Sequence, residues 1–111
     1  LEKALHSDLG KPGVEAMAAD IGMPKGEAAI AIKNLKSWMK PQRVTQPLVQ
    51  RPGKSWVQYD PLGVVLIIAP WNYPVQLCFN PLVAAVAAGN CAVIKPSELT
   101  PLSGLLLAAL A

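Results

Sequence analysis

The strongest constraint on the fold of this chain is the segment 61–94, which contains no charged residue. Within it, residues 63–69 form a continuous, mostly β-branched apolar run, typical of a strand buried on both faces. Residues 74–88 favour a helix that we expect Pro81 to kink or split, and Gly89-Asn90 is a left-handed helix ending. Residues 91–94 form a second short apolar strand, so the segment predicts one parallel strand–helix–strand crossover.

A further helix is predicted after this crossover, with Thr100 as its N-cap and Pro101 at its first position. In open parallel sheets, ligands bind beyond the carboxyl ends of the strands. The segments 70–74 and 95–98 directly follow the two predicted strands, so we expect both at one ligand-binding edge.

An uncharged segment of this length also allows a membrane span, which requires about 20 consecutive apolar residues. Here the apolar run is interrupted by prolines and amides, which would leave unpaired polar groups in lipid. The interrupting residues are Pro70, Asn72, Pro74, Gln76, Asn80 and Pro81. We therefore predict buried α/β sequence and no transmembrane segment.

The first sixty residues predict short helices followed by a hairpin. Helices are expected over 2–9, closed by Gly10; over 14–21, ended by Gly22-Met23-Pro24; and over 27–40, stopped by Pro41. Residues 48–51 and 55–59 favour two strands around a Pro52-Gly53 type II turn, within a loop that is wider than two residues.

Hydrophobic residues make up 52% of the 111 residues. This fraction is high for a small domain, because a large share of a small domain's surface is exposed to water. Residues 105–111 form an apolar helix without the usual stop signals. We therefore expect part of a larger protein, whose apolar faces pack against sequence outside this segment. The predicted fold class is α/β: N-terminal helices and a β-hairpin, then the first βαβα unit of a Rossmann-like parallel sheet, as an incomplete domain.

The charge and cysteine content argue against nucleic-acid binding, metal binding and a nucleophilic cysteine. The net charge of +3 is dispersed, without the basic clusters of a nucleic-acid module. No His/Cys cluster has metal-ligand spacing, and no signal peptide is recognisable. Cys78 and Cys91 lie in apolar sequence without a basic neighbour, which indicates reduced core thiols in a cytoplasmic protein rather than nucleophiles.

Asn72 is the first candidate for chemistry. Pro70 and Pro74 fix their own φ and restrict the residues before them, so Asn72 lies on a stiff backbone. A held amide that donates to a developing oxyanion is typically worth ~2.7–4 kcal/mol of barrier. The alternative is a loop asparagine that bonds nearby backbone.

Lys95 and Glu98 are the second candidates, because an ammonium and a carboxylate can together hold the hydroxyls of a ribose. The alternative is a solvated lysine and a carboxylate in the first turn of a helix, where the dipole favours it. Ser97 has a simpler interpretation, a hydroxyl that bonds its own turn.

Taken together, four motifs between residues 61 and 98 closely resemble the cofactor domain of the aldehyde dehydrogenase superfamily, in spacing as well as residue type. Three upstream motifs resemble its class 3 branch, which acts on medium-chain aliphatic and aromatic aldehydes. The motifs are PLGVV at 61–65, PWNYP at 70–74, AAGN at 87–90, KPSE at 95–98, ALHSDLGKP at 4–12, NLKSWM at 34–39 and PGKSW at 52–56.

The resemblance implies roles for individual residues. The asparagine that matches Asn72 donates to the aldehyde oxygen, and the pair that matches Lys95 and Glu98 binds the adenosine ribose of NAD or NADP. Further positions line the cofactor site: Ile68, Ala69, Pro70, Trp71, Pro96 and Ser97. The family's nucleophilic cysteine and general-base glutamate have no counterpart within this chain.

The resemblance also implies an organisation: a helical N-terminal part of the cofactor domain over 1–43, a hairpin of the bridging arm used in subunit pairing over 44–60, and the first βαβα unit over 61–111. It implies a homodimeric parent enzyme. Gly22, Pro24 and Gly26 depart from the pattern and predict a looser helical lead. The competing hypothesis is a catalytically inactive module for nucleotide binding or subunit pairing.

Overall fold

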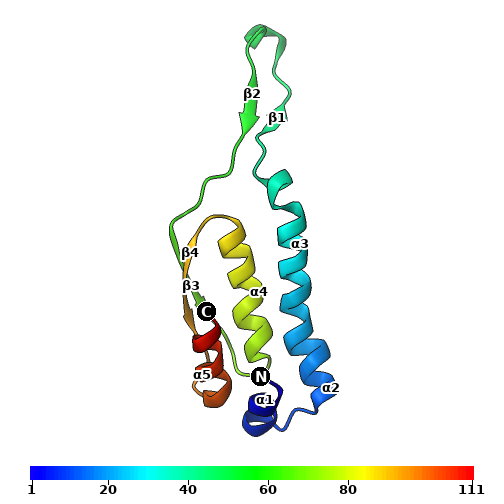
Figure 1. Cartoon of the computed structure of the whole chain (residues 1–111). Coiled ribbons are helices and arrows are strands. Elements are labelled where there is room, and N and C mark those ends of the chain that lie inside the picture. Colours follow the sequence, from blue (N-terminus) through cyan, green and yellow to red (C-terminus); the bar gives the residue numbers. More distant parts are fainter.

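The computed structural model describes residues 1–111 and contains five α-helices, two other helical segments and two pairs of strands (Figure 1). The elements are α1 Glu2–Leu9, α2 Gly13–Glu15, η1 Ala16–Ile21, α3 Gly22–Trp38, β1 Gln42–Val44, η2 Leu48–Gln50, β2 Ser55–Val57, β3 Val64–Ile68, α4 Pro74–Ala87, β4 Cys91–Lys95 and α5 Pro101–Leu110. β1 and β2 are antiparallel, whereas β3 and β4 are parallel.

The predicted parallel crossover is present. β3 and β4 pair in register from Val64 opposite Cys91 to Ile68 opposite Lys95, with α4 between them in the chain. Gly89 has the expected left-handed conformation, with φ of 82°. The helix α4 continues through Pro81, so the predicted split is wrong.

The helical lead differs from the prediction, because no break occurs at residues 22–24. α2, η1 and α3 follow one another without interruption, and η1 is a π-helix. The N–H of Gly22 donates to the carbonyl of Met17, five residues earlier, and a Cβ at position 22 would lie 2.8 Å from that oxygen. Gly22 therefore admits the wider π-helical turn instead of ending a helix. Pro24 lies buried in the first turn of α3.

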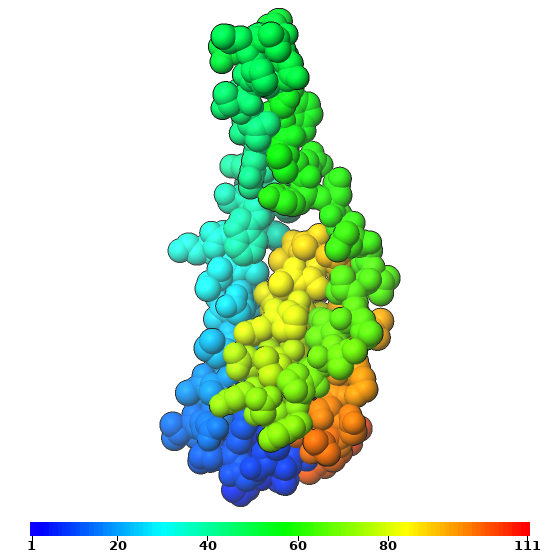
Figure 2. Space-filling model, turned by 180° about the vertical axis from the view of Figure 1, so that it is seen from behind, coloured from blue at the N-terminus to red at the C-terminus, as the bar shows by residue number.

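The hairpin lies between α3 and β3 and projects from the rest of the molecule as a narrow arm (Figure 2). Its strands are β1 and β2; residues 48–50, predicted as a strand, instead form the 3₁₀ turn η2. Gly53 does not have a positive φ, so the predicted type II turn is also absent. The expected wider loop is correct, because ten residues separate Val44 from Ser55.

The parallel pair is covered on one face only. α4 packs against the face that carries Ile67, which is 8% exposed. On the opposite face Leu66 is 63% exposed and Val93 is 55% exposed, and Cys91 is exposed as well. The predictions of a strand buried on both faces and of a buried Cys91 are therefore wrong for this segment, because none of its elements packs there.

The core lies at one end of the crossover. Its six buried residues come from α1, η1, the end of β3, α4 and α5: Leu5, Ala16, Ala69, Val75, Cys78 and Leu107. This core therefore lies directly beside the carboxyl ends of β3 and β4. No helix combines the length and the apolar character that crossing a membrane requires.

Candidate functional site

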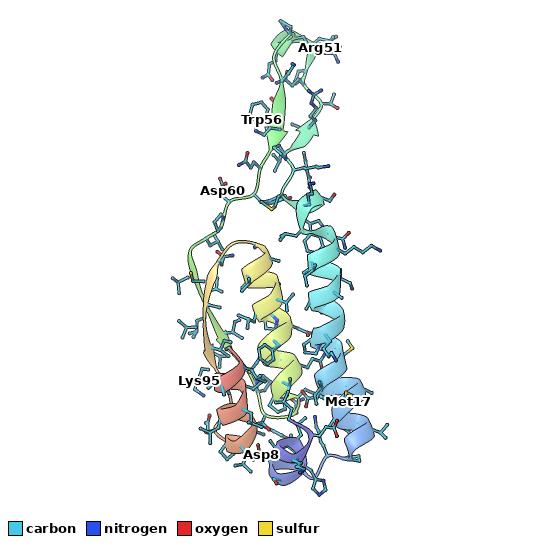
Figure 3. The ribbon with its side chains drawn as sticks, in the orientation of Figure 1. Asp8, Met17, Arg51, Trp56, Asp60 and Lys95 are labelled. Atoms are coloured by element: carbon cyan, nitrogen blue, oxygen red, sulfur yellow. The ribbon has the colours of Figure 1, made fainter.

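The two loops that were predicted to share an edge do leave the parallel pair side by side. Ile68 is paired with Lys95, and the next residue, Ala69, donates its N–H to the carbonyl of Lys95 over 3.1 Å. We refer to residues 68–73 and 95–100 together as the rim. Figure 3 shows Lys95 beside α5. The hairpin, which carries Arg51 and Trp56, lies at the opposite end of the molecule.

Asn72 is exposed in the first of these loops, and its side chain makes no hydrogen bond within the chain. Pro70, on one side, is exposed, whereas Pro74, on the other, is fully buried and begins α4. The backbone of Asn72 thus lies between a strand end and a packed helix start, and the N–H groups of its side chain are available to an outside acceptor.

Lys95 and Glu98 form an ion pair with 3.0 Å between Nζ and Oε2, and their side chains are 57% and 80% exposed. Hydrogen bonding from the backbone N–H of Glu98 itself, followed by hydrogen bonding from Lys95, lowers the pKa of the Glu98 carboxyl. Glu98 precedes α5 by three residues, so it does not lie in the first helical turn. The alternative based on the helix dipole therefore does not apply to it.

The other predicted residues lie along the same rim with different degrees of exposure. Ile68 is 67% exposed on the uncovered sheet face, beside Lys95, and Trp71 is 50% exposed. Ala69 is 4% exposed, so it contributes little accessible surface to the rim. Pro96 is half-buried. Ser97 accepts a hydrogen bond from the N–H of Leu99 over 3.2 Å, as its turn interpretation predicted.

Sequence reasoning missed the group that holds the start of α4. Oδ1 of Asp20 accepts from the N–H groups of Val75 (3.0 Å) and Gln76 (2.8 Å), while Oδ2 accepts from Nζ of Lys11 over 2.9 Å. Asp20 is fully buried, and Lys11 is 8% exposed. The available signal was indirect: Tyr73 occupies the N-cap of α4 and cannot cap it, so an acceptor from elsewhere was required.

A second distant carboxylate caps α5. Asp8 accepts from the N–H groups of Leu102 (3.3 Å) and Ser103 (2.7 Å). Thr100 stands at the predicted N-cap position, but its side chain does not cap the helix. Its hydroxyl lies 3.4 Å from the carbonyl of Ser97, to which it donates. The predicted capping role of Thr100 is therefore wrong, because Asp8 takes it.

Two further contacts surround the start of α4. Nζ of Lys11 lies 3.8 Å from the ring centroid of Tyr73, a cation–π geometry that ties the loop residue before Pro74 to the N-terminal segment. Cys78 lies one turn into α4, where burial and then the charge of Asp20 raise the pKa of its thiol. A raised pKa disfavours the thiolate, so Cys78 is poorly suited to nucleophilic attack.

Comparisons with known proteins agree with the resemblance found in the sequence. The sequence model of the aldehyde dehydrogenase family matches residues 1–111 of this chain. A 4,4'-diaponeurosporen-aldehyde dehydrogenase of Staphylococcus aureus is 56% identical over 99 residues, which are 89% of this chain and 22% of that protein. Aldehyde dehydrogenase family 3 member B3 of Mus musculus is 48% identical over 100 residues, 90% of this chain and 21% of that protein.

A solved structure supports the same conclusion. The substrate-bound state of Staphylococcus aureus AldH superposes with a TM-score of 0.96 at 51% identity, and the match covers 98% of this chain and 24% of that one. This chain therefore spans between a fifth and a quarter of the length of these relatives.

Proposed function

Because this chain belongs to the aldehyde dehydrogenase family, we propose that it is part of a longer NAD(P)-dependent enzyme that oxidises an aldehyde to a carboxylic acid. The observation that carries the proposal is the shared rim, where the loop of Asn72 and the Lys95–Glu98 pair leave neighbouring parallel strands. This is the edge at which parallel α/β sheets bind their ligands.

In this proposal, Asn72 donates its side-chain N–H to the aldehyde oxygen as that oxygen gains negative charge. Its lack of a partner within the chain supports the role, because the amide gives up no internal hydrogen bond when the substrate arrives. Its backbone is anchored between the end of β3 and the buried Pro74, which limits the reorganisation of the loop, and limited reorganisation is the condition for electrostatic catalysis. The nucleophile and the general base lie in sequence outside this chain.

The adenosine ribose is assigned to Lys95 and Glu98. Their exposure and opposite charges suit a diol, since the ammonium can donate to one hydroxyl while the carboxylate accepts from the other. Ile68, beside Lys95, offers an apolar surface, and Pro70, Trp71, Pro96 and Ser97 complete the cofactor surface. A bound NAD or NADP supplies the acceptor for the hydride, and both cofactors remain within the proposal.

The remaining features of the proposal concern the whole protein. The substrate is a medium-chain aliphatic or aromatic aldehyde, as in the class 3 branch. The hairpin of β1 and β2 belongs to an arm that pairs two subunits in a homodimer, in keeping with its projection from the remaining structure (Figure 1). The two free cysteines support a cytoplasmic location.

Replacing Asn72 with Ala in the full-length enzyme tests the catalytic assignment. We expect kcat to fall by ~10²–10³-fold with little change in cofactor affinity, because the amide acts only on the developing oxyanion. Steady-state kinetics and a cofactor titration measure the two quantities.

Asn90→Ala is the matched control for this experiment. Asn90 accepts from the N–H of Gly63 at the amino ends of the strands, away from the rim. Its loss is expected to lower the unfolding temperature but to leave the turnover of the folded enzyme unchanged. Full turnover in Asn72→Ala would remove Asn72 from the mechanism.

A further inference from the structure

We propose that Asp20 and Asp8 are positioning residues, and that each carboxylate fixes one of the two rim loops from the helical N-terminal segment. Asp20 acts on the loop 69–73, which carries Asn72, and Asp8 acts on the loop 96–100, which follows Lys95. The inference rests on the proposed function for the roles of the two loops in catalysis and cofactor binding. The contacts that anchor the loops do not depend on that function.

The Asn72 loop is anchored at both of its ends. At the strand end, Ala69 is bonded to the carbonyl of Lys95. At the helix end, Asp20 accepts from two consecutive backbone N–H groups of α4, and no residue of the loop itself caps the helix. Only a few residues lie between these anchors, so a displacement of the α4 start must be transmitted to Asn72.

Lys11 strengthens this anchor by making two contacts. Its ammonium pairs with the second carboxylate oxygen of Asp20 and lies over the ring of Tyr73, the neighbour of Asn72. Both charged groups are buried, so a loss of either partner leaves an uncompensated charge in the core. The pair therefore restrains the carboxylate in one orientation and the loop residue beside it.

The second loop is anchored in the same way by a different carboxylate. Asp8 bonds two consecutive N–H groups of α5, and the loop before them is closed by the N–H of Thr100 donating to the carbonyl of Ser97 over 3.3 Å. Figure 3 shows Asp8 in α1, beside α5, and Lys95 on the opposite side of α5.

The two anchors are separate contacts of one segment. α1, which carries Asp8, packs on α5, whereas η1, which carries Asp20, packs on α4. Since each carboxylate holds one helix start, the structure assigns a different kinetic consequence to each. Asp20 is linked to turnover through Asn72, and Asp8 to cofactor binding through Lys95 and Glu98.

The experiment compares Asp20→Ala with Asp8→Ala in the full-length enzyme, each serving as the matched control of the other. We expect Asp20→Ala to lower kcat by roughly 10- to 100-fold, the effect of a small misplacement of a catalytic group, with the KM for cofactor within about twofold. Asp8→Ala is expected to raise that KM by about tenfold and to change kcat little. Equal effects of both variants on both parameters would overturn the proposal.

A double variant tests whether Asp20 acts through Asn72. On an Asn72→Ala background, Asp20→Ala should cause no further loss of kcat, because the group it positions is already gone. A full additional loss would show that Asp20 supports the enzyme in some other way. Asp8→Asn should restore the cofactor KM, because Asn caps a helix as well as Asp does.

Hydrogen exchange provides a readout that does not depend on activity. Asp20→Ala should accelerate exchange of the backbone amides of 69–76 and leave that of 96–104 unchanged. Asp8→Ala should accelerate exchange at 96–104 and leave that of 69–76 unchanged. If Asn72→Ala keeps full turnover but this exchange pattern appears, the proposed function fails and the positioning holds. If exchange accelerates at neither loop or at both loops in each variant, the positioning fails.

Asp20→Asn covers the case in which Asp20→Ala does not fold. The amide oxygen still caps α4, but its NH₂ group cannot accept from Lys11, so the cap is kept while the ion pair is lost and the Lys11 ammonium is left without its partner. We expect a smaller fall in kcat, about tenfold, and local exchange at 69–76. Wild-type kcat and exchange in this variant would contradict the role given to Lys11.

Discussion

At the scale of single residues, the rim and the core beside it contain groups in very different chemical environments. Asn72 has no internal partner, Glu98 is anionic and exposed, and Cys78 is a buried thiol with a raised pKa. Hydrogen-bonding capacity that faces outward is available for ligands, whereas the sulfur is withdrawn into the core. This distribution separates the residues that bind from those that only pack.

The lowered pKa of Glu98 gives a prediction for pH dependence. A depressed pKa keeps the carboxylate ionised at and below the ordinary value for glutamate, so the group loses its charge only in more acidic solution. Glu98→Gln should therefore raise the cofactor KM by a factor that stays constant from about pH 6 to 9. Parallel kinetics of both enzymes measure this factor, and a factor that changes within this range would contradict a permanently anionic Glu98.

Cys78 gives the opposite prediction, that its thiol has no chemical role. Cys78→Ala in the full-length enzyme should keep kcat within about twofold, because the raised pKa leaves little thiolate. The loss of a buried sulfur should lower stability by about 1–2 kcal/mol. Loss of covalent aldehyde chemistry in this variant would make Cys78 the nucleophile and exclude our assignment.

At the scale of elements, two glycines separate the effect of backbone conformation from that of packing. Gly10 has φ of 67° at the end of α1, Gly26 lies within α3, and a Cβ at either position would meet no atom within 4 Å. Gly10→Ala should lower the free energy of unfolding by about 1–2 kcal/mol, whereas Gly26→Ala should raise it by about 0.5–1 kcal/mol. Denaturant unfolding of the full-length enzyme measures both changes. If the two substitutions changed the free energy of unfolding in the same direction, the conformational explanation would be wrong.

The elements also show which parts of the fold could be predicted from sequence. The β3–α4–β4 crossover and its two loops followed from local patterns: an apolar run, a glycine ending and prolines at fixed places. The path through Gly22 could not be predicted, because a π-helical turn depends on how η1 packs against α4 and α1. The second strand of the hairpin was predicted where β2 lies, but the first was misplaced because residues 42–44 lack the apolar character that marked residues 48–51.

The two helix caps lay furthest beyond sequence reasoning. Asp20 and Asp8 bond amides that are 55 and 94 residues away, and local rules assign a cap only to the residue before a helix. The candidate site could therefore be predicted as a set of exposed groups on two loops. The groups that hold those loops could not, since only the tertiary structure brings them together.

At the scale of the whole molecule, the segment is extended and thinly packed. Its radius of gyration is 18.9 Å, against about 13 Å expected for a compact domain of this size, and only 14 of 111 residues are buried. The uncovered face of β3 and β4 is apolar, with Leu66 and Val93 largely exposed. We expect this face to be buried by other parts of the longer enzyme.

One double substitution tests this expectation, because it should benefit the isolated chain and damage the full-length enzyme. Leu66→Gln with Val93→Gln should reduce self-association of the isolated 111-residue chain, because exposed apolar area is removed. In the full-length enzyme, the same change should prevent accumulation of folded protein, since it would place amides in a core. Sedimentation of the isolated chain and the soluble yield of the enzyme are the measurements. Ile67→Gln, on the covered face, should harm both proteins, and a folded, active enzyme with both glutamines would refute the expected burial.

The order of the caps along the chain has a consequence for biosynthesis. Both acceptors, Asp8 and Asp20, lie upstream of the helices whose amides they bind. A growing polypeptide emerges with its N-terminal part first, so each acceptor has left the ribosome before its donors appear. The first turns of α4 and α5 can therefore bind a carboxylate that has already emerged as soon as these turns form.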